Sequence, residues 1–353
     1  MDLAELLQYA VQYQASDLHL TVGRPPMVRL AGKLVASGYE QVLAADDTKN
    51  LIYSVLTDDQ KAKFEEEHEL DFSLGIPGIS RFRVNVFMQR GSVAGVFRTI
   101  GDDIPTVQQL GVSQAVQQLA LLPRGLVLVT GPTGSGKSTT LASLIHLINS
   151  EKEAHIVTIE DPIEFVHPHG KCTINQRELG TDTFSFPRAL KSVLREDPNV
   201  VLVGEMRDLE TIAAALTLAE TGHLVLSTLH TQDASQTVDR IIDVFPPYQQ
   251  EQIRVMLAAT LKGVVSQILL PLSDGSGRIA ARETLIVTPA IAAIIREGKT
   301  HQIYSAIQTG GRDGMVTMEQ SLAGLVAGGL VSAEDALSKA NYPEEFRNLA
   351  RLT

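Results

Sequence analysis

The sequence is poor in the residues that mark several classes of protein. Cys172 is the only cysteine in 353 residues, so neither an internal disulfide nor a cysteine zinc cage can form. Tryptophan is absent. No apolar run approaches the ~18 residues of a membrane-spanning helix, and Asp2 and Glu5 stand where a signal peptide carries basic residues. We therefore expect a cytoplasmic protein that does not insert into a membrane.

Positive charge is also scarce. The chain has 30 Lys and Arg against 41 Asp and Glu, which gives a net charge of −11. A protein whose main role is to bind nucleic acid needs a basic surface, so we expect no nucleic acid partner. Apolar residues make up 44% of the chain and charged residues 20%, as in a globular α/β protein. The length favours two domains.

The first hundred residues predict a small α+β domain. A helix is expected near the N-terminus, since Leu3, Leu6, Leu7 and Ala10 share one helical face. Further helices are expected at 47–56 and 58–68, and hairpins at 27–35 and 81–99. Chain-breaking residues at 101–106 predict a linker. We divide the chain into a first domain at 1–100, a linker at 101–112 and a second domain at 113–353.

The second domain alternates predicted strands and helices. Strands are expected at 125–130, 155–159, 199–205 and 223–230, and helices at 140–148, 187–196 and 209–221. Several of these strands end in polar residues, which is typical of a mostly parallel sheet with its chemistry at the carboxyl ends of the strands. Residues 248–353 are expected to be largely helical, with one pair of strands.

A phosphate-binding loop follows the first of these strands. Residues 131–139 fit the pattern G-x-x-x-x-G-K-[ST] between an apolar strand and a helix. The glycines allow backbone N–H groups to converge on phosphate oxygens, so we expect ATP and Mg²⁺ as cofactors. Lys137 should reach the β- and γ-phosphates, and the Ser138 hydroxyl should hold Mg²⁺. The expected nucleotide-binding residues are Gly131, Pro132, Thr133, Gly134, Ser135, Gly136, Lys137, Ser138 and Thr139.

Two acidic segments lie downstream of the loop. Glu205 ends an apolar strand, as does the second acidic group of a phosphate-loop ATPase, which holds Mg²⁺ directly or through water. Glu160, Asp161 and Glu164 crowd together after another strand. Such crowding is costly unless a cation or a water-activating role offsets the repulsion. A solvated acidic loop is the alternative interpretation.

Histidines and arginines supply further candidates. His223 and His230 bracket one strand, and strand alternation assigns them to opposite faces, so they are not expected to share a metal. His230 is placed to sense a γ-phosphate, whereas His223 is also explained by packing or capping. Arg81 and Arg83 share one face of a predicted strand, and an ordinary solvated face explains them equally well.

Four ordered motifs resemble one protein family. GPTGSGKSTT, TIEDPIEFVH, LREDPNVVLVGEMRD and TGHLVLSTLH are similar to motifs of the type II/IV secretion ATPase (GspE) superfamily, whose members drive type II secretion and type IV pili. SDLHL, RFRVNVF and YSAIQTGGRDGMVTME resemble its PilT-like branch, the type IV pilus retraction ATPases. The resemblance covers nearly the whole chain. It implies an ATP-hydrolysing motor that retracts pili by pilin disassembly and so powers twitching motility.

The resemblance also implies an architecture and partners. The subunit would have a PAS-like N-terminal domain and a RecA-like ATPase domain, and six copies would form a ring. The ring would act on an inner-membrane pilus platform protein, from a peripheral position on the cytoplasmic side, with a paralogous retraction ATPase as a further partner.

Residue roles follow from the same resemblance. Glu164 would be the catalytic glutamate, Glu205 the Mg²⁺-associated glutamate and His230 a nucleotide-contacting histidine. Arg83 and Arg195 would reach a nucleotide, at least one of them across a subunit boundary.

The chain departs from the family pattern at one position, and other functions stay open. Family members carry A-I-R at the start of a C-terminal helix, where this chain has Ala290-Ile291-Ala292. This departure bears on retraction and not on ATP hydrolysis.

An extension or secretion ATPase is one alternative, although such proteins usually carry a four-cysteine zinc insert. A low-turnover accessory subunit is another alternative. Lys137, Glu164 and Glu205 argue against it, because such a subunit does not need all three residues.

Overall fold

The computed structural model describes residues 2–30, 32–101 and 103–351. The chain divides into two compact units. The first comprises Met1–Asp103 with Glu164–Val166, and the second comprises Ile104–Ile163 with His167–Thr353. Residue 31 of the predicted hairpin and residue 102 of the predicted linker lie outside the described residues. The domain and linker boundaries at 100 and 112 stay a prediction.

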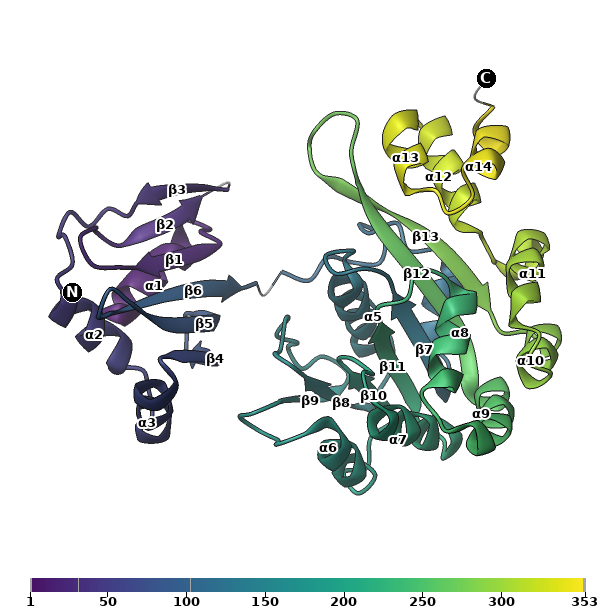
Figure 1. The fold of residues 1–353 in the computed structure, drawn as a ribbon, viewed down its shortest axis with the longest axis horizontal. Coiled ribbons are helices and arrows are strands. Elements are labelled where there is room, and N and C mark those ends of the chain that lie inside the picture. The colour runs from purple at the N-terminus through teal and green to yellow at the C-terminus, as the bar shows by residue number, and fades with distance from the viewer. Residues whose placement is uncertain (1, 31, 102, 352–353) are drawn as a thin grey trace. The chain divides into compact units, whose positions relative to one another are not determined.

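The first unit is built on an antiparallel sheet in the order β3-β2-β1-β6-β5-β4 (Figure 1). Helix α1 begins with a capping box between Asp2 and Glu5 and buries the four apolar residues expected of it. The helices are α1 (Leu3–Gln12), α2 (Ala45–Tyr53) and α3 (Asp58–Glu67). The strands are β1 (Asp17–Leu20), β2 (Met27–Leu30), β3 (Lys33–Ala36), β4 (Glu69–Ile76), β5 (Ser80–Gln89) and β6 (Ser92–Ile100).

The second unit is built on a seven-stranded sheet in the order β13-β12-β7-β11-β10-β8-β9. All neighbouring strands are parallel except the β12–β13 hairpin. The carboxyl ends of the parallel strands therefore lie along one edge, where the predicted site residues follow them. The strands are β7 (Gly125–Thr130), β8 (His155–Glu160), β9 (Thr173–Glu178), β10 (Val200–Val203), β11 (Leu224–Leu229), β12 (Leu261–Pro271) and β13 (Arg278–Ile286).

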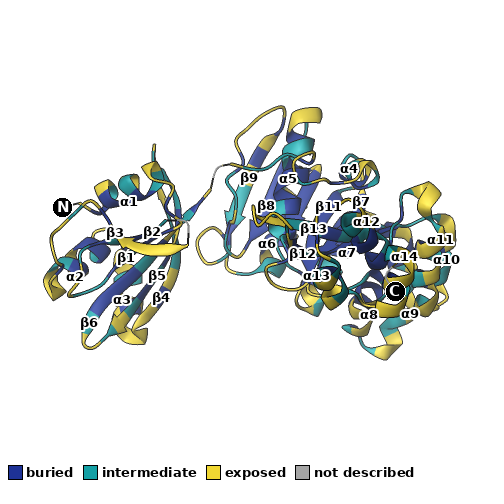
Figure 2. Ribbon diagram, turned by 90° about the horizontal axis from the view of Figure 1, so that it is seen from above, coloured by how far each residue is buried: buried dark blue, intermediate teal, exposed yellow. Residues whose placement is uncertain are grey.

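Both faces of this sheet are covered, which explains the near-continuous apolar strand sequences. On β7, Leu126 and Leu128 pack into one core, whereas Val127 and Val129 pack into another with α4 and α5. Figure 2 shows the central strands as buried. The helices are α4 (Gln114–Ala120), α5 (Lys137–Glu151), α6 (Phe186–Val193), α7 (Leu209–Glu220), α8 (Ala234–Asp243), α9 (Pro247–Thr260), α10 (Pro289–Arg296), α11 (Ile303–Thr309), α12 (Met318–Ala327), α13 (Ala333–Lys339) and α14 (Pro343–Ala350).

The last three helices form a small core of their own with the far part of the β12–β13 hairpin, around Leu270, Ala281 and Phe346. The largely helical C-terminal region with one strand pair is thus confirmed. In the part of the chain that the structure describes, none of the helices has the length and apolarity needed to cross a membrane.

Several predicted boundaries are wrong by a few residues. The helix expected at 187–196 ends at Val193, because the chain turns there and Asp197 takes a positive φ of 53° before Pro198. Arg195 consequently lies beyond the helix. The strand expected at 199–205 is limited to Val200–Val203, so Glu205 lies in the loop that follows.

Candidate functional site

The phosphate loop has the backbone that its glycines predict. Gly131, Gly134 and Gly136 have φ angles of 139°, 78° and 85°, a region that other residues rarely adopt. A Cβ on Gly131 would lie 2.2 Å from the Gln267 carbonyl oxygen, so strand β12 leaves no room for a side chain there. The loop then leads into α5, which starts at Lys137.

Polar groups of the loop turn inward. Lys137 is buried, and its Nζ donates to the carbonyl oxygens of Gly131 at 2.8 Å and Pro132 at 3.0 Å. The Ser135 hydroxyl is also buried, and no hydrogen-bond partner for it exists among the described residues. Ser138 and Thr139 lie half-buried in the first turn of α5. This constellation fits the phosphate groups of a nucleotide.

Glu205 is positioned by the neighbouring strand. The N–H of Met206 donates to the carbonyl of Thr228 on β11 at 3.2 Å, and the Thr228 hydroxyl donates to the carbonyl of Gly204 at 2.7 Å. Because Gly204 has no side chain, the segment that carries Glu205 packs closely against the acidic segment that begins at Glu160. A Cβ on Gly204 would lie only 3.3 Å from the Cα of Glu160.

Two basic side chains hold the Glu205 carboxylate. Nε2 of His230 lies 3.1 Å from Oε1, and the Arg207 guanidinium lies 2.7 Å from Oε2. Burial opposes ionisation, but the hydrogen bond and charge of Arg207, with the charges of His230 and Lys137, leave the pKa of Glu205 below its ordinary value. Glu205 is therefore an ionised carboxylate beside the lysine of the loop.

These residues fit a Mg²⁺ ion. Mg²⁺ prefers hard oxygen ligands and usually shares them with phosphate oxygens and water. A hydroxyl at Ser138 and an ionised Glu205 belong to that donor class. Across residues 2–30, 32–101 and 103–351, no group of three or more His, Cys, Asp and Glu side chains could hold a metal.

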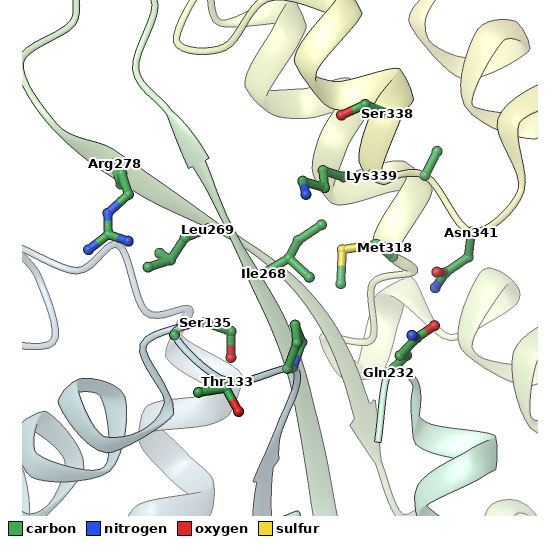
Figure 3. A pocket seen from close by; sticks show the side chains of 13 residues that line it. Thr133, Ser135, Gln232, Ile268, Leu269, Arg278, Met318, Ser338, Lys339 and Asn341 are labelled. Atoms are coloured by element: carbon green, nitrogen blue, oxygen red, sulfur yellow. The ribbon is translucent and has the colours of Figure 1, made fainter. Parts of the chain in front are cut away.

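A cavity of about 440 Å³ opens beside the loop (Figure 3). Thr133 and Ser135 face it from the loop, Ile268 from β12, and Lys339 from the end of α13. Its full lining is Pro132, Thr133, Gly134, Ser135, Gln232, Ile268, Leu269, Arg278, Met318, Ser338, Lys339, Ala340 and Asn341. The C-terminal helices thus contribute to the site, which the sequence did not indicate.

The structure gathers only part of the predicted site. Lys137, Glu205 and His230 come together at the strand ends. Arg195 is exposed and lines a different cavity, with Arg188 and Lys191 among its other residues. Glu164 and Arg83 are exposed and belong to the first unit. The roles of these last three residues remain predictions.

Sequence reasoning missed two residues of this site. Arg207 holds Glu205, and Gln267 of β12 is 1% exposed and hydrogen-bonded to the phosphate loop. The signal for Gln267 was a polar residue inside the apolar run VVSQILL. A buried polar side chain needs a partner, but the sequence does not say which one.

Comparisons with known proteins identify the family to which the chain belongs. Residues 2–335 match the family described as type II/IV secretion system protein. The chain is 52% identical over 351 residues to the type IV pilus retraction ATPase PilT of Pseudomonas aeruginosa, covering 98% of this chain and 100% of that protein. It is 51% identical over 321 residues to a twitching motility protein of Neisseria gonorrhoeae, covering 91% and 86%.

A solved structure extends the likeness to the fold. The pilus retraction motor PilT with bound ADP matches with a TM-score of 0.91 at 48% identity, over 98% of both chains. This match confirms the expected fold class, an α/β protein with an N-terminal antiparallel-sheet domain, a mostly parallel ATPase sheet and a helical C-terminal region.

Proposed function

The chain belongs to the type II/IV secretion system protein family, and from this membership we propose that it is the ATPase that powers type IV pilus retraction. The observation that carries the proposal is a phosphate loop whose lysine lies beside the Glu205–His230 pair, in a chain 52% identical to a retraction ATPase along nearly its whole length. An extension ATPase of the same superfamily is less well supported, since two relatives that are 52% and 51% identical to the chain are named for pilus retraction and for twitching motility.

The residues of the second unit suggest how ATP is bound. The loop N–H groups and Lys137 bind the phosphates, and a phosphate is a stronger partner for the ammonium group than the two carbonyls that it now contacts. The adjoining cavity of about 440 Å³ accepts the nucleoside. Ser138 and Glu205 hold Mg²⁺, which neutralises charge on the phosphates when bound.

Hydrolysis requires groups beyond the loop. Glu164 orients or deprotonates the attacking water as the catalytic glutamate. Arg83 and Arg195, both exposed, reach a nucleotide, at least one of them on a neighbouring subunit. The active site is therefore completed only by assembly, and the family resemblance supports a hexameric ring with a PAS-like first domain and a RecA-like second domain.

The motor acts on membrane-bound partners from the cytoplasmic side. ATP binding and release change the relation between the two domains, and the ring passes this movement to an inner-membrane platform protein, with a paralogous retraction ATPase as a further partner. The consequence is disassembly of pilin subunits from the base of the fibre.

A deletion strain tests the direction of the motor. Without this protein, cells should keep or over-accumulate surface pili while losing twitching motility, and the intact gene should restore motility. A gene carrying Lys137→Ala should not restore it, because ATP binding is lost. Complete loss of pili would establish the extension function instead, and unchanged motility would exclude both.

A further inference from the structure

Both ends of the phosphate loop rest on one residue, Gln267. At the start of the loop, the Gln267 carbonyl oxygen packs so closely against Gly131 that a Cβ on this glycine would lie 2.2 Å from it. Near its end, the Gln267 side-chain Nε2 donates to the carbonyl oxygen of Ser135 at 2.7 Å. The opposite atom, Oε1, accepts from the Thr140 hydroxyl in the first turn of α5 at 2.9 Å. One buried amide thus ties strand β12 to the loop and to the helix that follows it.

The bond to Ser135 orients the next N–H group. A trans peptide is planar, so the carbonyl of Ser135 and the N–H of Gly136 point in opposite directions. With this carbonyl held towards Gln267, the Gly136 N–H is aimed away from β12. Gly136 itself has a φ of 85° and is the N-cap of α5. The N–H groups of such a turn bind phosphate oxygens, so Gln267 fixes one of the donors that a nucleotide uses.

Arg282 connects Gln267 to a distant segment of the same unit. The two residues face each other in the β12–β13 register, and Arg282 Nε donates to Gln267 Oε1 at 3.4 Å. The guanidinium also donates through one NH group to the carbonyl of Leu110 at 3.0 Å and to that of Gly111 at 3.4 Å. Leu110 and Gly111 lie just before α4, in the first residues of the second unit.

We propose that Gln267 and Arg282 form a relay that couples the conformation of the phosphate loop to the segment 104–112, through which the chain enters the ATPase unit. Gln267 is a positioning residue, because it acts through the loop backbone. A shift of the Ser135 carbonyl on nucleotide binding moves the Gln267 amide, which changes how Arg282 holds the carbonyls of Leu110 and Gly111. By linkage, a constraint on this segment also alters nucleotide affinity. The proposal rests on the ATPase function and adds to it a coupling between the nucleotide site and residues 104–112.

The test uses the full-length protein, with ADP as the ligand. ADP affinity is measured by titration with a fluorescent ADP analogue. Amide hydrogen exchange of residues 104–112 is followed without ADP and at saturating ADP. In the parent protein, ADP should slow exchange in this segment, where Leu110 and Val112 donate backbone hydrogen bonds to Thr106 and Val107. Gln267→Leu, which keeps the size but has no polar group, should lower ADP affinity by ~10-fold, about the value of one buried hydrogen bond.

Arg282→Gln separates the relay from the site itself. The variant should still bind ADP, but ADP should no longer slow exchange of residues 104–112. Ser321→Ala is the matched control, because the Ser321 hydroxyl accepts from the backbone N–H of Arg282 at 2.9 Å and not from its guanidinium. This control should weaken the same strand while keeping the response to ADP. If Gln267→Leu does not fold, Gln267→Asn keeps an amide that is too short to reach Ser135 and serves in its place.

Three results would overturn the relay. They are an ADP response in Arg282→Gln equal to that of the parent, no response in the parent at saturating ADP, and parent-like ADP affinity in the folded Gln267 variant. Failure of the proposed function looks different, since the parent protein would then neither bind ADP nor hydrolyse ATP.

Discussion

Nε2 of His230 lies 3.1 Å from Oε1 of Glu205, so the ends of two neighbouring strands meet at one carboxylate. Arg207 holds the other oxygen at 2.7 Å. Because His230 is itself exposed, it can contact the carboxylate and still reach a bound nucleotide. With both contacts, His230 would link the state of the nucleotide to Glu205, the residue that we propose holds Mg²⁺.

His230→Ala should lower the rate of ATP hydrolysis by about 10- to 100-fold, the usual cost of removing a group that orients a metal-associated ligand. If His230 acts through the γ-phosphate, ADP affinity should stay unchanged while kcat falls. Steady-state kinetics and ADP titration measure the two quantities. His223→Ala is the control, since His223 lies at the other end of β11, with Nδ1 3.0 Å from the Leu218 carbonyl. Equal losses in both variants would argue against a specific role for His230.

Glu164→Gln should retain ATP binding and lose turnover by about 10² to 10⁴-fold, because the amide cannot accept a proton from water. Rapid-quench or phosphate-release assays measure the rate, and nucleotide titration measures binding. Glu153→Gln removes an exposed carboxylate from the segment before β8 and should have little effect. Hydrolysis at the parent rate in Glu164→Gln would show that another group activates the water.

The ATPase active site should contain residues from two neighbouring subunits. Subunits with Lys137→Ala cannot bind ATP, and those with Arg83→Ala or Arg195→Ala cannot supply that arginine. Mixed rings should regain part of the ATPase activity for at least one arginine, since a finger supplied in trans can contribute about 10³ to 10⁵ in rate. Activity of the parent protein should also rise more than linearly with concentration. No recovery with either arginine would place both on the subunit that binds the ATP.

Stability should depend on pH through Glu283. Burial, together with the charges of Asp233 and Glu319, raises the pKa of Glu283 to about 7. The hydrogen bond donated by the Ala234 N–H at 2.8 Å lowers this pKa but does not offset the effect of burial. In the unfolded chain the carboxyl group ionises at its ordinary, lower pKa. Between these two values the native state binds the extra proton, so the free energy of unfolding falls as pH rises towards 7 and levels off above it.

Glu283→Gln removes this pH dependence by keeping the group neutral. The variant should match the parent near pH 4, below the ordinary pKa of the carboxyl group, and be more stable at pH 8, by up to ~3 kcal/mol. Denaturant unfolding at the two pH values measures the difference. The Oε1 bond to Ala234 can persist in the variant, whereas Oε2 of the parent is a buried atom with no partner among the described residues. A parent-like pH profile in Glu283→Gln would place the titration on another group.

The sequence predicted the fold class because the central strands are buried on both faces. Segments such as 125–130 and 224–229 therefore read as apolar runs, whatever lies beside them. Strand β9 was missed for the opposite reason. Its sequence TINQRE carries no apolar pattern, and it is a strand because it pairs with β8.

The site was predicted as far as its residues lie in short motifs. Lys137 and Glu205 each follow a recognisable strand, and parallel strands bring such ends together. Gln267 and Arg207 could not be predicted in the same way. The contact of Gln267 with Ser135 depends on the pairing of β12 with β7, which no local pattern encodes.

The position of β7 in its sheet has a consequence for synthesis of the protein. Its two neighbours, β11 and β12, begin at Leu224 and Leu261, long after the phosphate loop has been translated. Chains emerge from the ribosome N-terminus first, so the loop leaves it without the strands that later flank it. A nascent chain that ends before residue 271 lacks part of β12 and should be unable to retain nucleotide. The ability to use ATP would therefore arise late in translation, after the first unit has had time to fold.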